Sequence, residues 1–269
     1  MKKIIATTVA ALIAILSFAP FFWMISASLM HSGEANTYPP RFIPTELDFS
    51  HYIDLFRRLN LFGYLRNSLF LSIAVTAISL LVNSMSGYAF AKFRFPKKDI
   101  VFKFLITSMV IPGQVTMLPL FLLLKQMHLI NTYFAIIIPG MVSIFGVFLI
   151  RQYAQTIPDS LIEAAKMDGA SETEIYRKII LPLCRPILVT LGIFTFMGTW
   201  NDFLWPLIVM TDSSMYTLPV AIANLMGEHV QDTELMMAGS VLTTLPMVLL
   251  FIALQRFYIG GIMMGGVKE

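Results

Sequence analysis

The polar residues of this chain occur in combinations that can bind and dock, but not in combinations that cleave bonds. The sequence contains no Gly-x-x-x-x-Gly-Lys-Ser/Thr loop to cradle a phosphate, no Gly-x-Ser-x-Gly and no His-Glu-x-x-His. Its four histidines stand apart, and no histidine, cysteine and carboxylate residues share the spacing of a metal site. We therefore expect no catalytic residue, no metal and no cofactor in this chain.

One polar segment, residues 158–182, has the residue types of a docking element. Asp159 and Glu163 suit a helix N-terminus electrostatically, and Ser160 with Glu163 has the spacing of a capping box. Gly169 suits the end of this helix, because glycine adopts the left-handed conformation that closes a helix. The segment is predicted to begin with a short helix and a sharp turn.

A second helix is predicted directly after the turn. Ser171 and Glu174 repeat the capping-box spacing, and Pro182, which lacks an amide hydrogen, would break or kink the helix. Ala164 and Ala165 of the first helix have small side chains, so another backbone can approach them. The segment therefore resembles either a hairpin that docks in a groove of a partner or an amphipathic hairpin that rests on a bilayer.

The remaining chain has the composition of a membrane protein. It is 57% hydrophobic and 13% charged, with a mean hydropathy of +0.75, whereas soluble chains carry about 25% charged residues. Continuous apolar runs rather than alternating ones predict helices long enough to cross a bilayer. We expect one all-α membrane domain over residues 1–269 with six spans, at about 4–29, 66–91, 100–124, 133–150, 186–210 and 238–258.

The basic residues predict the orientation of these spans. With a cytoplasmic N-terminus, 14 of the 19 Lys and Arg residues fall on the cytoplasmic side, as the positive-inside rule expects. The other five are Arg41, Arg57, Arg58, Arg66 and Lys125. This orientation makes both termini cytoplasmic and places a loop of residues 151–185, which contains the polar segment, on the side where ATP is.

The N-terminus has a second interpretation, as a cleaved signal peptide. Lys2 and Lys3 precede an apolar stretch, and small residues follow at Ser26, Ala27 and Ser28. A signal sequence has an apolar core of about 7–15 residues, and the uncharged run here is nearly twice as long. We therefore expect a retained first span.

Polar residues within the predicted spans are candidates for a translocation path. Such residues are costly in a bilayer and usually face a bundle interior or a water-filled path. A path for a neutral polar solute would use neutral hydrogen-bonding groups and aromatic faces. The candidates are Asn83, Tyr88, Gln114, Trp200, Asn201 and Asp202. The alternative is that these side chains bond to neighbouring helices and serve packing.

The fixed positions of the polar segment form a recognisable pattern. They read Glu163-Ala164-Ala165, Gly169, Ile179 and Leu181-Pro182. At these spacings the segment resembles the EAA loop of the membrane subunits of bacterial ABC importers, which is the contact with a separate ATPase. The resemblance implies an ATPase-coupling role for Glu163, Ala164, Ala165, Asp168, Gly169, Ala170 and Pro182.

Further motifs extend this resemblance over nearly the whole chain. They are Gly87 to Pro96, Gly198 to Leu207, Tyr216 to Pro219 and Gln255 to Tyr258. They are similar to those of the smaller permease subunit of maltose and oligosaccharide importers, although Asp202 stands where glutamate is more usual there. The resemblance implies a type I importer fold in the bacterial or archaeal cytoplasmic membrane. It also implies a second permease subunit, a dimer of ATPase subunits that use ATP and Mg, and an extracytoplasmic sugar-binding protein.

Three other functions remain open at this point. The chain could serve an ABC importer for a non-sugar solute, or it could be an ion-coupled secondary transporter. The latter needs an ionisable relay within the membrane, for which Asp202 is the one candidate. An intramembrane enzyme is the third, and the missing catalytic motifs argue against it.

We expect Gly169→Asp to uncouple ATP hydrolysis from transport while the protein still inserts in the membrane. The substitution disturbs the turn that closes the first helix of the polar segment. Transport and ATP hydrolysis measured on the same membranes test this. Normal transport by the variant would contradict our account of the loop.

Overall fold

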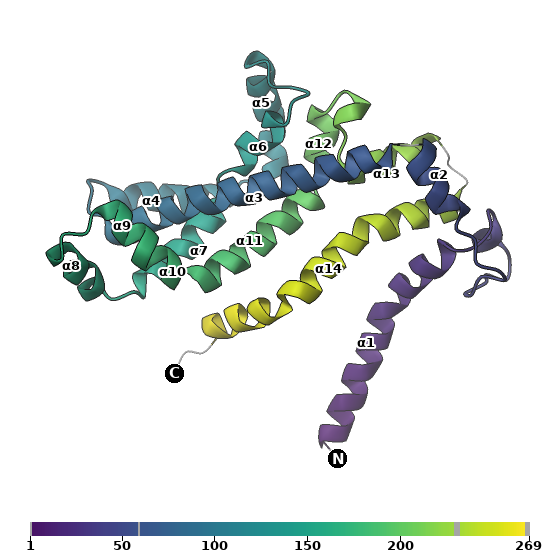
Figure 1. Cartoon of the computed structure of the whole chain (residues 1–269), viewed down its shortest axis with the longest axis horizontal. Helices are drawn as coiled ribbons and strands as arrows, with labels where there is room; N and C mark the ends of the chain where they lie inside the picture. The colour runs from purple at the N-terminus through teal and green to yellow at the C-terminus, as the bar shows by residue number, and fades with distance from the viewer. Residues whose placement is uncertain (1, 59, 229–231, 267–269) are drawn as a thin grey trace. The chain divides into compact units, whose positions relative to one another are not determined.

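The computed structural model describes residues 2–58, 60–228 and 232–266 (Figure 1). Within these residues all regular secondary structure is helical, and loops join the helices. The chain forms two compact units. Unit 1 consists of residues 1–65 and 217–250, and unit 2 consists of residues 66–216 and 251–269. The polar segment 158–182 therefore lies wholly within unit 2.

Unit 1 combines the N-terminal helix with a later part of the chain. Its elements are α1 (Lys2–Ala27), η1 (Glu34–Asn36), α2 (Ser50–Arg58), α13 (Leu218–Glu228) and the first part of α14 (Thr233–Gly266). A small core of Ala27, Met30 and Ala35 packs with Trp23 and Met237. The buried Glu234 at the start of α14 accepts a hydrogen bond from the Ala35 amide at 2.7 Å. This bond joins the two stretches of chain that make up the unit.

Unit 2 contains the remaining helices, beginning with all but the first turn of α3. In chain order they are α3 (Leu61–Lys92), α4 (Lys98–Ser108), α5 (Gly113–Gln126), α6 (Phe134–Gly140), α7 (Ile144–Gln155), α8 (Asp159–Met167), α9 (Glu172–Ile175), the π-helix η2 (Tyr176–Ile180), α10 (Leu181–Leu183), α11 (Arg185–Trp200), α12 (Leu204–Val209) and the 3-10 helix η3 (Ser213–Met215). In Figure 1 the elements α8, α9 and α10 lie where α3 ends and α4 begins.

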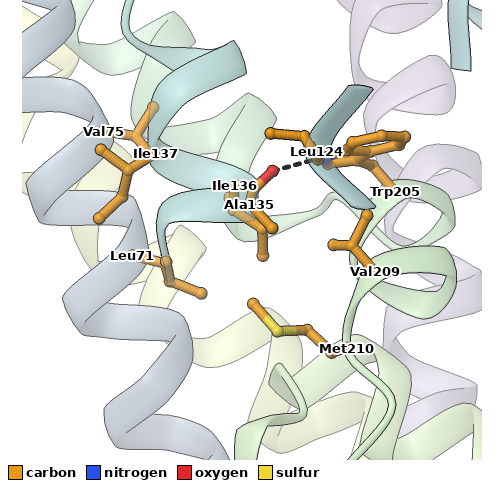
Figure 2. Close-up of a cluster of buried hydrophobic side chains, with 9 residues drawn as sticks. All are labelled: Leu71, Val75, Leu124, Ala135, Ile136, Ile137, Trp205, Val209 and Met210. Carbon is orange, nitrogen blue, oxygen red and sulfur yellow. Dashed lines mark hydrogen bonds between the residues drawn. The ribbon is translucent and has the colours of Figure 1, made fainter. Parts of the chain in front are cut away.

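A buried apolar cluster joins α3, α5, α6 and α12 within unit 2 (Figure 2). It contains Leu71, Val75, Leu124, Ala135, Ile136, Ile137, Trp205, Val209 and Met210. Trp205 is the largest of these side chains, and its indole Nε1 donates to the carbonyl of Ala135 at 3.0 Å. The tryptophan thus adds apolar area to the cluster without leaving its polar N–H unpaired.

Four described helices are long and apolar enough to cross a membrane, and there are six candidates if two bent helix pairs each count as one span. The four that qualify without such pairing are Lys3–Ala27, Leu61–Lys92, Phe134–Gln155 and Thr233–Ala253. The pair of α4 and α5 bends by 103°, and the pair from Glu172 to Trp200 bends by 77°. Helices lie in the predicted stretches, with three corrections to their boundaries.

The first correction is that the predicted span 100–124 is interrupted, because Pro112 is the extended N-cap of α5 and α4 ends at Ser108. The second is that the predicted span 186–210 stops at Trp200, where Asn201 caps α11. A hydropathy window averages over about 19 residues, so it does not detect either short break, although Asn201 and Asp202 in the second are polar. A proline disfavours the helical conformation of the residue before it, which accounts for the first break.

The third correction is an interruption between α6 and α7 within the predicted span 133–150, and it has a side-chain partner from α3. Ser143 caps α7, and its hydroxyl accepts from the Gly146 amide at 3.2 Å. The Ser143 amide is freed by the break and donates to Oδ1 of the buried Asn83 at 3.0 Å. Asn83 in turn donates to the Ser79 hydroxyl at 2.7 Å. Asn83 therefore makes the hydrogen bonds that the packing alternative expects, and its part in a path stays a prediction.

Helices α3 and α7 approach closely at Gly87. A Cβ atom at this position would lie 2.7 Å from Cγ2 of Ile150 and 3.1 Å from the Arg151 amide nitrogen. The latter atom is backbone and cannot move aside alone. Only glycine lets the two helices meet at this distance.

We expect Gly87→Ala to destabilise the protein by about 1–3 kcal/mol, the usual cost of overpacking a well-packed contact. Gly198→Ala is the matched control, since a Cβ there would meet nothing within 4 Å. Thermal unfolding of both variants in the same detergent checks this expectation. Equal midpoints would show that α3 and α7 are not in close contact.

Candidate functional site

The first helix of the polar segment, α8, starts at Asp159 with Pro158 as its N-cap. Pro158 is extended, with φ −60° and ψ 134°, and makes no side-chain cap. The predicted capping box of Ser160 and Glu163 is therefore wrong, because Ser160 already lies inside the first turn. Asp159 in that turn still suits the positive end of the helix dipole.

The end of α8 follows the prediction for Gly169. This residue has φ 81°, a left-handed conformation that side chains rarely adopt. Its amide donates to the Lys166 carbonyl at 3.1 Å, and the Ala170 amide donates to the Ala165 carbonyl at 2.9 Å. These two bonds form a Schellman motif, which satisfies the last carbonyls of the helix. Asp168 is the C-cap just before the glycine.

The second helix starts with the predicted capping box. The Glu174 amide donates to the Ser171 hydroxyl at 3.3 Å, and the Ser171 amide donates to Oε2 of Glu174 at 3.1 Å. The helix then widens into the π-helix η2, in which the Leu181 amide donates to the Tyr176 carbonyl. Pro182 lies just beyond, in α10, before the 77° bend. Residues 158–182 are called the polar hairpin below.

One side of the polar hairpin is anchored in unit 2. Ile162 and Ile175 are buried in a cluster with Tyr88, Ala154, Ile157, Ile180 and Cys184. Ala165 and Ala170 pack against this cluster. The hairpin is therefore attached by apolar contacts and not by its chain connections alone.

The other side of the polar hairpin is exposed and mixes apolar with acidic side chains. Glu163, Ala164 and Asp168 are exposed. Leu161 and Met167 are 46% and 83% exposed, although both are large and apolar. Because Leu161, Ala164 and Met167 follow one another at three-residue spacing, they lie along one face of α8. This face is a small apolar strip with charged edges.

A charged cavity of about 570 Å³ lies between α8 and the end of α3. Its lining includes Lys92, Arg94, Asp159, Glu163, Lys166 and Glu172. Nζ of Lys92 lies 2.6 Å from Oδ1 of Asp159, and this hydrogen bond, with the lysine's charge, holds the pKa of Asp159 below its usual value. Nζ of Lys166 lies 2.5 Å from Oε1 of Glu172.

Sequence reasoning missed the role of Lys92 in this arrangement and counted it only as a charge of the cytoplasmic side. The sequence feature that could have indicated this role is the four-residue spacing of Ser84, Tyr88 and Lys92, which places three polar side chains on one face of α3. Glu172 and Tyr176 repeat the same spacing in the polar hairpin.

The candidate path residues are distributed over several elements of unit 2. Asn83, Tyr88 and Trp200 are buried, and Tyr88 lies against the polar hairpin. Gln114 is exposed at the start of α5. Asn201 and Asp202 lie in the break after α11, where Oδ1 of Asp202 accepts from the Trp205 amide at 3.4 Å. Their part in a path stays a prediction.

Comparison with known proteins agrees with this architecture. The chain matches the family described as "Binding-protein-dependent transport system inner membrane component" over residues 83–262. It is 39% identical over 261 residues to the arabinooligosaccharides transport system permease protein AraQ of Halalkalibacterium halodurans, covering 96% of this chain and 94% of the relative. It is 33% identical to the lactose transport system permease protein LacG of Rhizobium radiobacter, covering 100% and 97%.

A solved structure shares the fold at lower sequence identity. It is a bacterial ABC transporter involved in the import of the acidic polysaccharide alginate, with a TM-score of 0.85 at 21% identity, and the likeness covers 95% of this chain and 96% of that chain. At this identity the likeness shows the fold. With the family match and the relatives, it shows that the chain is a multi-pass membrane protein and belongs to the binding-protein-dependent transport system inner membrane components.

Proposed function

We propose that this chain is a membrane-spanning subunit of an ATP-driven ABC importer for a sugar or oligosaccharide. The observation that carries the proposal is the exposed face of α8, in which Leu161, Ala164 and Met167 form an apolar strip beside Glu163. Exposed apolar strips with polar edges are typical of interaction sites. The polar hairpin is rigidly capped and anchored, as a docking element must be.

The partner at this face is an ATPase encoded on another chain. The sequence has no phosphate-binding loop of its own, so ATP and Mg belong to the partner. A helix laid in a groove of the partner would bury the apolar strip and leave Glu163 and Asp168 at the rim. The positive-inside distribution of Lys and Arg supports a cytoplasmic position for the hairpin and for both termini.

The proposed substrate class comes from the relatives. The two permease relatives are named for arabinooligosaccharides and for lactose, and both are covered almost end to end by this chain. An oligosaccharide is neutral and rich in hydroxyl groups, which neutral side chains such as Gln114 and Asn201 suit. We propose that these residues and Asp202, all outside the buried core, contribute to the path.

The remaining partners complete the importer. A second permease subunit forms the other half of the path, and an extracytoplasmic binding protein delivers the sugar. In this arrangement ATP closes the ATPase dimer and moves the docked α8. The spans joined to the polar hairpin then change between outward and inward access.

We expect Ala164→Arg to reduce the amount of ATPase that co-purifies with the tagged chain by about tenfold or more. A large unpaired cation at the centre of an interface costs several kcal/mol, and about 1.4 kcal/mol corresponds to tenfold in affinity. Gln155→Arg, at an exposed position at the end of α7, is the control and should co-purify the ATPase normally. Purification from mild detergent with quantitative mass spectrometry measures both.

Purification of the native chain tests the proposed function itself. Co-purification of a P-loop ATPase and a second six-span permease supports it. A native chain that is isolated alone and stable, and whose transport ignores ATP but is abolished by an uncoupler, would favour an ion-coupled transporter instead.

A further inference from the structure

The last turns of α3 present three polar side chains to the polar hairpin. Ser84, Tyr88 and Lys92 recur every four residues, so they lie on one face of the helix. Together they extend over about 12 Å of helix axis, at about 1.5 Å per residue. Each of the three bonds to the hairpin or to the residue just before it, although α3 is not its neighbour in the chain. We call this set of three residues the α3 latch.

The first two latch residues contact the second helix of the hairpin. The Ser84 hydroxyl lies 2.6 Å from the Tyr176 hydroxyl, and the Tyr88 hydroxyl donates to Oε2 of Glu172 at 3.2 Å. The Tyr88 ring also stacks on that of Tyr176, with centroids 5.8 Å apart. Tyr88 is only 3% exposed. Ser84 and Tyr88 are four residues apart on α3, and they thus bond to two hairpin residues, Tyr176 and Glu172, that are also four residues apart.

Lys92 contacts the start of α8. Its Nζ donates to the Ile157 carbonyl at 2.5 Å and to Oδ1 of Asp159 at 2.6 Å. These residues flank Pro158, the N-cap from which α8 starts. The Lys92 side chain is 8% exposed and that of Asp159 is 74% exposed, so only the lysine end of this pair is shielded from solvent.

A further ion pair extends the connection to the other end of α8. Glu172 accepts from Tyr88 through Oε2 and pairs with Lys166 through Oε1 at 2.5 Å. Lys166 lies in the last turn of α8. Both ends of the proposed docking helix are therefore linked to α3, one directly through Lys92 and one through Glu172.

We infer that the α3 latch makes α3 move together with α8 when a partner displaces the polar hairpin. The chain joins the hairpin only to α7 and α11, so without the latch a displacement would reach α3 only through packing. Ser84, Tyr88 and Lys92 are positioning residues in this mechanism. The inference rests on the proposed function, because it needs an ATPase that moves α8.

The test is a distance between the polar hairpin and α3 in the whole complex with its co-purified ATPase. Spin labels are placed at Arg177→Cys, an exposed position of the hairpin outside the apolar strip, and at Ile73→Cys on α3, which is 54% exposed. The buried Cys184 is replaced by serine. The distance between the two labels is measured by double electron–electron resonance in two states. One state has no nucleotide, and in the other ATP and vanadate have trapped the complex. With an intact latch, we expect the same distance distribution in both states.

Substitutions of Lys92 then separate coupling from simple packing. Lys92→Met should let the distance shift on trapping and should raise the ATP hydrolysed per solute imported. Lys92→Arg keeps the charge and two donors, so it should restore the native behaviour. Lys97→Met makes the same chemical change at an exposed lysine and should have no effect. Tyr88→Phe removes only the bond to Glu172 and provides the test if Lys92→Met fails to insert.

Two results would overturn the inference. One is a native distance that shifts on trapping, and the other is a Lys92→Met or Tyr88→Phe complex whose distances match the native ones in both states. In either case the ATPase still co-purifies, and the proposed function stands. If no ATPase co-purifies with the native chain, the proposed function fails, and the latch loses its coupling role with it.

Discussion

A break in a helix frees backbone groups that need new partners, and within a bilayer lipid cannot supply them. Three asparagines of this structure supply such partners, one at a break between spanning helices and two at the loop after α12. Asn83 accepts from the Ser143 amide at the break before α7. Asn131 accepts from the amides of Thr211 and Asp212 after α12, at 3.0 Å each. Asn67 donates to the carbonyls of Ser214 and Tyr216. Asparagine serves in all three places because its side chain has both a donor and an acceptor.

The polar hairpin meets the same constraint locally. Its two helices carry their own terminal motifs, the Schellman motif at Gly169 and the capping box at Ser171, so its backbone needs little from the rest of the protein. Its attachment to unit 2 can then be made largely by side chains, through a buried apolar cluster and the α3 latch. This division gives a hairpin of fixed shape whose contacts can transmit a displacement.

The parts that sequence reasoning could predict are those set by local chemistry. The turn at Gly169 and the capping box at Ser171 were visible because the residues that form them lie within a few positions of one another. The predicted spans ran through the breaks at Pro112 and after Trp200, because a span is drawn from hydropathy averaged over about 19 residues and a short break hardly changes that average. The partner of Asn83 was not predictable either, since Ser143 is sixty residues away in the chain and only packing brings the two together.

The π-helix at Tyr176–Ile180 has a consequence for how this hairpin can change in length. A π turn holds one residue more than an α turn, and each residue of an α-helix rotates the next by about 100° around the axis. The five residues of the π-helix therefore turn about as far around the axis as four residues of an α-helix, about 400°. A deletion of one residue there would leave a regular helix in which Pro182 and the start of α11 keep nearly the same orientation toward Glu172 and Tyr176. A deletion within α11 would instead rotate all that follows by about 100°.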